Sequence, residues 1–302
     1  MSNRSLPFWL VAAGVAIGQR PGLGGPLPIR WQRRWLDTVA GLMPNPSGTV
    51  LRTVELAGRP ALRVTVGATE RPHAVLHLHG GAYTVGSPRS HRGLAALLAQ
   101  ASGSVVYLPD YRLAPEHPYP AALDDAVRAA EELAEQYPTF AISGDSAGGG
   151  LAVATARRLA DAGTVRPAAL ALISPWVDPG APAGRRRDLV VREKWGRICA
   201  THYLGAGELT DAGFAPGRGR LDGLPPTIVH VGRREVLYEQ VIEFAANLAA
   251  AGVAVRLTEL PRLWHVGHVS AGVLAESREA VAELGEFLRA KLTAAAQPAR
   301  LS

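Results

Sequence analysis

The pentapeptide Gly144-Asp145-Ser146-Ala147-Gly148 has the residue types and spacing of an exposed nucleophilic serine. The short apolar segment 139–143 predicts a buried strand, and the Ala- and Leu-rich segment 149–162 predicts a helix. A sharp turn between them holds the serine backbone in a sparsely populated conformation, where glycine neighbours avoid clashes. The helix N-terminus supplies N–H groups that suit a developing oxyanion. The alternative is a glycine-rich turn with an ordinary helix-capping serine.

A serine nucleophile needs a base, and four histidines follow Ser146 in the chain. His230 lies within an apolar strand segment, where a core role is expected, and His202 lies in a long insertion. His265 and His268 occupy the loop after the last predicted strand, which ends at the same sheet edge as Ser146. His265 is favoured as the base because it comes sooner after the strand, whereas His268 is expected to open the final helix.

The acid that orients the base is expected just beyond the strand 227–231, and Glu235 stands there. The alternative for Glu235 is a first-turn glutamate that stabilises the helix dipole. Glu239 lies one turn further on and would point away from the loop. The remaining acidic candidates lie in the insertion or after an earlier strand: Asp178, Asp211 and Asp222.

The segment His79-Gly80-Gly81-Ala82 follows the predicted strand 73–78 and is suited to bind an oxyanion. Successive glycines let two backbone N–H groups turn toward a carbonyl oxygen without interference from side chains. Two histidine pairs offer an alternative as metal ligands, His77 with His79 and His265 with His268. No carboxylate or cysteine completes a first shell near the second pair, and a role in anchoring the loop is favoured for His79. We therefore expect no metal and no cofactor.

Composition favours a compact globular protein, since 47% of the 302 residues are hydrophobic and 19% are charged. The net charge is +6, but the only dense basic run is Arg185–Arg187. We interpret these basic residues as spread over the solvated surface of the protein, and we expect no nucleic-acid partner. Cys199 is the only cysteine, so no intrachain disulfide forms, and no activating pattern marks it as a nucleophile.

Short apolar segments alternate with helical ones along most of the chain, which predicts a parallel sheet covered on both faces. Segments 50–56 and 61–66 alternate apolar and polar residues, as in a half-exposed hairpin at a sheet edge. The expected strands continue at 74–78, 105–108, 140–143, 168–173, 227–231 and 253–257. The fold class is therefore α/β, with a mostly parallel eight-stranded sheet flanked by helices.

Two segments are too long for simple connections and are expected to form a helical cap over the carboxyl ends of the strands. The chain then divides into an N-terminal cap segment (1–48), a first catalytic part (49–178), a cap insertion (179–222) and a second catalytic part (223–302). The apolar stretch Leu6–Ile17 is too short to span a bilayer, so no membrane span is expected. We favour the interpretation that this stretch forms a helix packed above the active site. The alternative is a secretory signal peptide.

Several motifs together resemble the hormone-sensitive-lipase family of α/β hydrolases, over most of residues 73–270. They are His79-Gly80-Gly81-Ala82, the run from Tyr111 to Asp125, Gly144-Asp145-Ser146-Ala147-Gly148-Gly149, Ser174-Pro175-Trp176 and Leu224-Pro225-Pro226. The resemblance implies a catalytic triad of Ser146, Glu235 and His265, and an oxyanion hole formed by the N–H groups of Gly80, Gly81 and Ala147. Two positions depart from the family pattern. Glu235 replaces the more frequent aspartate, and Ala82 replaces the third glycine, a loop type associated with turnover of tertiary-alcohol esters.

The expected activity is hydrolysis of short- to medium-chain carboxylic esters by a serine carboxylesterase, through an acyl-serine intermediate. An amidase, a lactonase or an acyltransferase uses the same triad, and a non-catalytic ligand-binding relative is a further alternative. A haloalkane or epoxide hydrolase would need an aspartate in place of Ser146 and is excluded. We expect a small ester as substrate and a cytoplasmic location, or a secreted or membrane-surface one if residues 1–18 are a signal peptide. A homodimer is consistent with the family resemblance.

Overall fold

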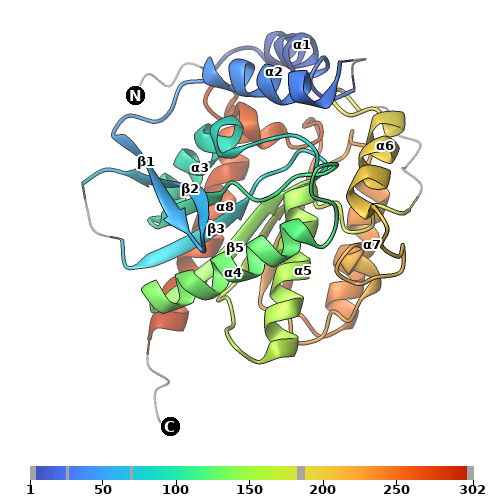
Figure 1. The fold of residues 1–302 in the computed structure, drawn as a ribbon. Coiled ribbons are helices and arrows are strands. Elements are labelled where there is room, and N and C mark those ends of the chain that lie inside the picture. Colours follow the sequence, from blue (N-terminus) through green and yellow to red (C-terminus); the bar gives the residue numbers. More distant parts are fainter. Residues whose placement is uncertain (1–4, 25–26, 69–70, 182–187, 298–302) are drawn as a thin grey trace.

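The computed structural model describes residues 5–24, 27–68, 71–181 and 188–297 (Figure 1). Within them, eight strands form one sheet in the order β1-β2-β4-β3-β5-β6-β7-β8. Neighbouring strands run parallel except in the pairs β1–β2 and β2–β4. The predicted α/β class and mostly parallel sheet are confirmed. The strands are β1 (Thr49–Leu56), β2 (Arg59–Val66), β3 (His73–Leu78), β4 (Val105–Pro109), β5 (Thr139–Asp145), β6 (Leu170–Ile173), β7 (Thr227–Gly232) and β8 (Val255–Leu260).

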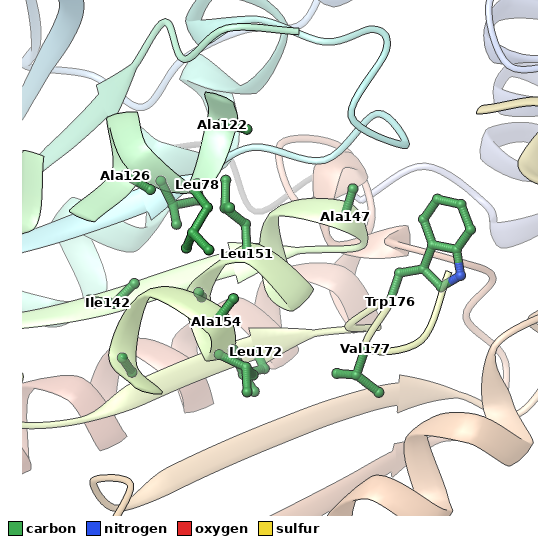
Figure 2. Close-up of a cluster of buried hydrophobic side chains, with 14 of the residues drawn as sticks. Leu78, Ala122, Ala126, Ile142, Ala147, Leu151, Ala154, Leu172, Trp176 and Val177 are labelled. Carbon is green, nitrogen blue, oxygen red and sulfur yellow. The ribbon is translucent and has the colours of Figure 1, made fainter. Parts of the chain in front are cut away.

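Helices cover both faces of the sheet, because the central strands bury side chains in both directions. In β3, Val75 belongs to the apolar cluster beneath α3 (Pro88–Ser102) and α8 (Ala275–Ala296), whereas Leu76 belongs to the cluster on the opposite face. That second face packs against α4 (Ala121–Gln136), α5 (Ala147–Ala162) and α7 (Tyr238–Ala250). Figure 2 shows small residues of α4, Ala122 and Ala126, and Leu151 of α5 beside Leu78 of β3.

The carboxyl ends of the central strands meet at one edge of the sheet. Leu78 of β3 is opposite Gly144 of β5, and Asp145 of β5 is opposite Ile173 of β6. Ile173 is in turn opposite His230 of β7. The loops that follow these strands therefore begin at the same level, which lets residues distant in sequence form one site.

Three helices lie at this edge (Figure 1): α1 (Phe8–Gln19), α2 (Ile29–Gly41) and α6 (Glu193–Leu204). Val11 of α1 is buried in a cluster with Leu263 and Trp264. The interpretation of this apolar N-terminal stretch as a cap helix, rather than as a signal peptide, stays a prediction. The limits 1–48 and 179–222 of the cap remain predictions, and Arg185–Arg187 lie outside the described residues.

Two predicted positions differ in the structure. Glu235 does not begin a helix, because α7 starts at Tyr238 and Glu235 lies in the preceding turn. Its carboxylate Oε2 accepts a hydrogen bond from Gly232 N–H at 2.8 Å, which fixes this turn. His268 does not open the final helix, since it belongs to a short 3₁₀ helix, η2 (Gly267–Ser270), and α8 begins at Ala275.

Gly148 and Gly196 offer a matched test of close packing beneath the nucleophile turn. A Cβ atom on Gly148 would lie 2.0 Å from the carbonyl oxygen of Leu78, whereas one on Gly196 in α6 would meet nothing within 4 Å. We expect Gly148→Ala to lower the free energy of unfolding by about 3 kcal/mol or more, because backbone must move. Gly196→Ala should raise it by about 0.5–1 kcal/mol through helix propensity. Urea unfolding of both variants measures this, and equal effects would contradict the packing argument.

Candidate active site

Ser146 occupies a strained turn between β5 and α5. Its backbone has φ 53° and ψ −121°, which is unfavourable for a residue with a side chain. Four hydrogen bonds hold it there: Ser146 N–H donates to Ile173 O at 2.8 Å, and Ser146 O accepts from the N–H groups of Trp176 at 2.8 Å, Gly149 at 3.0 Å and Gly150 at 3.1 Å. A Cβ on Gly144 would lie 2.2 Å from Gly148 O, so glycine is required before the serine. The helix-capping alternative does not hold, because the Ser146 side chain makes no cap hydrogen bond.

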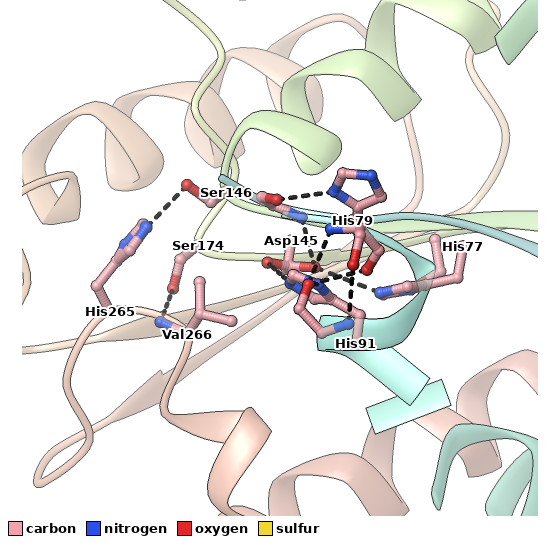
Figure 3. A network of polar contacts seen from close by, with 12 residues as sticks. His77, His79, His91, Asp145, Ser146, Ser174, His265 and Val266 are labelled. Atoms are coloured by element: carbon pink, nitrogen blue, oxygen red, sulfur yellow. Dashed lines mark hydrogen bonds and ion pairs between the residues drawn. The ribbon is translucent and has the colours of Figure 1, made fainter. Parts of the chain in front are cut away.

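His265 lies between Ser146 and Glu235. Its Nε2 is 2.8 Å from Ser146 Oγ, and its Nδ1 is 3.4 Å from Glu235 Oε1 (Figure 3 shows the first contact). The other oxygen of Glu235 accepts a hydrogen bond from Ser174 Oγ at 2.7 Å. The structure thus brings together the three residues predicted as a triad, with Glu235 fully buried. Ser174 follows β6 and was missed as a site residue, although it belongs to a motif that carries the resemblance.

Glu235 raises the pKa of His265 above its ordinary value of 6.5. Burial alone would lower this pKa, but the hydrogen bond and the charge of the carboxylate more than compensate. The Nδ1–H group is held toward Glu235, so Nε2 of the neutral ring faces Ser146 as an acceptor.

The pH dependence of kcat/KM tests this arrangement. A base must be neutral, so activity should fall as the pH drops through the pKa of His265, with a midpoint above 6.5. Glu235→Gln should move this acid limb to lower pH, because the raising charge is removed, and should lower kcat by about 10²–10⁴-fold. Profiles measured with a neutral soluble ester compare the two proteins. An acid limb unmoved in the variant would contradict the role of Glu235.

The predicted oxyanion donors differ in what they bind. Gly80 N–H donates to Asp145 Oδ1 at 3.0 Å, so it is already occupied, and the prediction for Gly80 is corrected. Gly81 and Ala82 adopt left-handed conformations, with φ 123° and 51°, and line the same cavity as Ser146. Within the described chain, no protein acceptor is recorded for the N–H groups of Gly81, Ala82 and Ala147. A Cβ on Gly81 would lie 2.1 Å from Val85 O, so this position requires glycine.

A buried polar network stands behind the nucleophile and the glycine loop (Figure 3). The two oxygens of Asp145 lie 3.3 Å from His77 Nε2 and 3.4 Å from His91 Nε2. His91 on α3 was not singled out in the sequence, since nothing around it marks it from a surface helix residue. His79 Nδ1–H donates to Gly80 O at 2.9 Å, and Tyr111 stacks on the His79 ring with centroids 4.3 Å apart. The anchoring role predicted for His79 is confirmed.

Asp145 and His91 form an ion pair. Burial opposes the charge of Asp145, but the charge of His91 and the contacts of both histidines hold the pKa of this carboxyl far below its usual range. Burial likewise opposes the charge of His91, yet Asp145 raises its pKa above the ordinary value. The contact thus favours the charged forms of both groups, and Asp145 orients the glycine loop through the Gly80 N–H group.

The other candidate residues lie outside this arrangement. His230 is buried in the core, with Nδ1 3.1 Å from His268 Nε2. Cys199 is buried, which raises the pKa of its thiol to about 12, and it accepts a hydrogen bond from Thr84 Oγ1. His202 belongs to α6. In the part of the chain that the structure describes, no group of three or more His, Cys, Asp or Glu side chains is arranged to hold a metal ion.

Two cavities of very different size meet at Ser146. The larger, of about 630 Å³, extends beneath α1 and α2 and is lined mainly by apolar side chains. The smaller, of about 50 Å³, lies between Trp176, Trp195 and Leu237. Ser146 and His265 line both cavities, so a group bound at the serine can extend into either.

Comparisons with known proteins agree with this geometry. A family model described as alpha/beta hydrolase fold matches residues 75–269. An acetyl-hydrolase of Streptomyces hygroscopicus is 40% identical over 230 residues, covering 74% of this chain and 77% of that protein. The putative acetyl-hydrolase LipR of Mycobacterium tuberculosis is 34% identical and covers 93% of this chain and 94% of that protein. The crystal structure of an esterase from the bacterial hormone-sensitive lipase family is 32% identical, with a TM-score of 0.88, and covers 95% of this chain and all of that one.

The match extends over more than half of the chain, and the fold, the strained serine turn and the neighbouring esterases agree. The chain therefore belongs to the hormone-sensitive-lipase family of α/β hydrolases and is a carboxylic ester hydrolase.

Proposed function

We propose that this protein is a serine carboxylesterase that hydrolyses short- to medium-chain esters through an acyl-serine intermediate. The observation that carries the proposal is the 2.8 Å contact between His265 Nε2 and Ser146 Oγ, with Glu235 on the other ring nitrogen. Ser146 Oγ attacks the ester carbonyl carbon while Nε2 takes its proton. The tetrahedral intermediate expels the alcohol, which receives that proton from His265. Water, activated by His265 in turn, releases the acid and restores Ser146.

The N–H groups of Gly81, Ala82 and Ala147 are our proposed oxyanion donors. This set differs from the one that the sequence predicts, Gly80, Gly81 and Ala147, because the Gly80 N–H group donates to Asp145. Each donor in comparable sites contributes about 3–4 kcal/mol to stabilisation of the transition state. The backbone at Ala82 is held in a left-handed conformation, so the group is oriented before substrate arrives.

The substrate is proposed to be an ester with one short and one long arm. The small cavity of about 50 Å³ accommodates a group of a few heavy atoms, whereas the cavity of about 630 Å³ accommodates a long apolar chain. Two relatives are named acetyl-hydrolases and another is named ethyl acetate hydrolase. These names support placing the acyl group in the small cavity and the alcohol in the large one.

Three isomeric esters test this substrate class: hexyl acetate, butyl butanoate and ethyl hexanoate. They share one composition and differ only in the position of the carbonyl, so their hydrophobicity is closely matched. We expect kcat/KM for hexyl acetate to exceed that for ethyl hexanoate by about tenfold or more, with butyl butanoate between them. The reverse order would place the acyl chain in the large cavity and overturn the assignment.

A p-nitrophenyl ester series from acetate to palmitate, with Ser146→Ala as control, tests the reaction class. Turnover of the short esters that disappears in the variant supports the acyl-serine route. Absence of turnover with every ester, in a folded protein, would instead favour an amidase, a lactonase, an acyltransferase or a ligand-binding relative.

Three further expectations accompany the proposed activity. We propose a cytoplasmic location, supported by the packing of α1 onto Trp264, because cleavage after residue 18 would remove a wall of the large cavity. None of the helices in the described segments combines the length and hydropathy needed to cross a membrane.

We also propose that segments 1–48 and 179–222 act as a cap. The protein is further proposed to form a homodimer, which sedimentation at several concentrations would test.

A further inference from the structure

Exposed apolar side chains are concentrated on the two N-terminal helices. In the described parts of the chain, nine of the fourteen large apolar residues with high exposure lie between residues 6 and 43. Such a concentration is unusual for the surface of a water-soluble monomer and marks an interaction site. We call the following six residues the cap face: Trp9, Ile17, Trp31, Trp35, Leu42 and Met43.

The composition of α1 explains why this surface is apolar. The helix Phe8–Gln19 contains no charged residue, so it has no polar side to turn toward water. One side packs inward, where the Phe8 ring lies 5.6 Å from the Trp264 ring. The opposite side leaves Trp9 69% and Ile17 76% exposed. Trp35 of α2 joins the two helices, since its Nε1–H donates to Gly18 O at 2.6 Å.

The charges around the cap face are positive. Arg20, Arg30 and Arg34 are exposed beside it, and the Arg34 guanidinium lies 5.2 Å from the centre of the Trp31 ring. Asp37 is the only acidic residue in the first 48 positions, and its carboxylate is turned inward, where it accepts a hydrogen bond from Ser87 Oγ. Helices with exposed tryptophan and arginine side chains fit the interface of a bilayer that contains anionic lipids.

The cap face is continuous with the active site. The cavity of about 630 Å³ that contains Ser146 is also lined by Ile17, Trp35, Leu42 and Met43. An apolar ester held in a bilayer beneath this face could thus reach the serine without crossing water. A protein partner seated on the same residues would cover this entrance, so the cavity favours a lipid surface over a protein.

We propose that the cap face docks on the surface of an anionic lipid bilayer. The tryptophan rings lie at the level of the headgroups, the arginines contact the lipid phosphates, and apolar esters pass from the bilayer into the large cavity. Docking does not depend on the proposed catalysis, whereas the delivery of esters rests on it. Binding and hydrolysis are therefore measured separately.

Flotation of the full chain with vesicles of phosphatidylcholine, with and without phosphatidylglycerol, tests the docking. We expect binding to the anionic vesicles only. Arg30→Gln/Arg34→Gln should weaken the partition coefficient about 25-fold, since each interfacial arginine contributes roughly fivefold. Trp9→Ser/Trp31→Ser should weaken it by about tenfold or more. Neither tryptophan lines either of the two cavities that meet at Ser146, so activity on soluble p-nitrophenyl acetate should be unchanged.

Matched controls change the same residue types elsewhere. Arg52→Gln/Arg289→Gln removes two exposed arginines from β1 and α8, and Leu209→Ser/Leu257→Ser removes two exposed apolar side chains outside the cap face. Both controls should bind vesicles like the unchanged protein. Equal weakening by the controls, or no binding of the unchanged protein to anionic vesicles, would overturn the proposal. A concentration-dependent dimer that Trp9→Ser/Trp31→Ser dissociates, without vesicle binding, would assign the face to a contact between two copies.

Discussion

Ser146→Ala is expected to lower kcat/KM for p-nitrophenyl acetate by about 10⁴-fold or more. The variant removes the atom that forms the bond to the acyl group and leaves the rest of the site in place. Among the described residues, the only recorded partner of the Ser146 hydroxyl is His265 Nε2 at 2.8 Å. Alanine keeps the Cβ atom, so the turn at φ 53° is no more strained than before. The thermal unfolding midpoint should therefore change little.

The double variant Ser146→Ala/His265→Ala sharpens this test. Nucleophile and base act as one unit, so the second substitution should lower kcat/KM only slightly further. Residual activity over the uncatalysed reaction comes from the oxyanion donors and binding. Activity above about one thousandth of the original, in a folded Ser146→Ala variant, would mean that another group is the nucleophile.

The sheet and the serine turn could be predicted because both depend on local sequence. Continuous apolar segments such as Val105–Leu108 can be satisfied only by burial on both faces, and they match β4 closely. Gly144 is required because a Cβ atom there would meet the backbone of Gly148, and Gly148 because a Cβ atom there would meet the backbone of Leu78 on the neighbouring strand. Chain order then brought Glu235 and His265 to the correct edge, since each follows a parallel strand that ends there.

The parts that were wrong or missed depend on tertiary contacts that have no local signature. The N–H group of Gly80 has the same chemistry as that of Gly81, and only the position of Asp145 decides which one remains for substrate. The role of His91 depends on how α3 packs, because its partner is 54 residues away in the chain. Glu235 was assigned to a helix start because the sequence beyond it is helical, but its hydrogen bonds to Gly232 and Ser174 keep the turn open.

Asp145 occupies the second position of the G-x-S-x-G pattern, which specifies no residue there, yet its side chain helps to hold the active site together. Its carboxylate is 2% exposed and touches three groups: His77 of β3, His91 of α3 and the N–H group of Gly80 in the loop after β3. A Cβ on Gly80 would lie 2.1 Å from Asp145 Oδ2, so loop and carboxylate fit without spare room. The position of the proposed oxyanion donors therefore depends on this residue.

Asp145→Ala is expected to lower the free energy of unfolding by about 3–5 kcal/mol, because it leaves His91 buried without its charge partner. It should also lower kcat by about 10²–10³-fold, since the glycine loop loses the acceptor that holds it. Asp145→Asn keeps the shape and an oxygen that can accept from Gly80 N–H, so it isolates the effect of the charge. Its kcat should fall less than that of Asp145→Ala, with KM nearly unchanged.

The pH dependence of the free energy of unfolding, compared between the unchanged protein and Asp145→Asn, shows whether the charge of Asp145 stabilises the fold. Folding lowers the pKa of Asp145, so the ionised carboxylate stabilises the folded protein. This stabilisation is complete above the pKa of aspartate in the unfolded chain, about 3.9, and is lost as the pH falls through the lower pKa of the folded protein. Folding raises the pKa of His91, so the protonated imidazole stabilises the folded protein. This stabilisation is complete below the pKa of histidine in the unfolded chain, about 6.5, and is lost as the pH rises through the higher pKa of the folded protein. Both contributions are complete only between these two values. The difference in unfolding free energy between the two proteins, measured in urea, should therefore be largest at about pH 5 and smaller at about pH 9. A difference that is constant with pH would mean that the pair is neutral and that Asp145 holds the loop by hydrogen bonding alone.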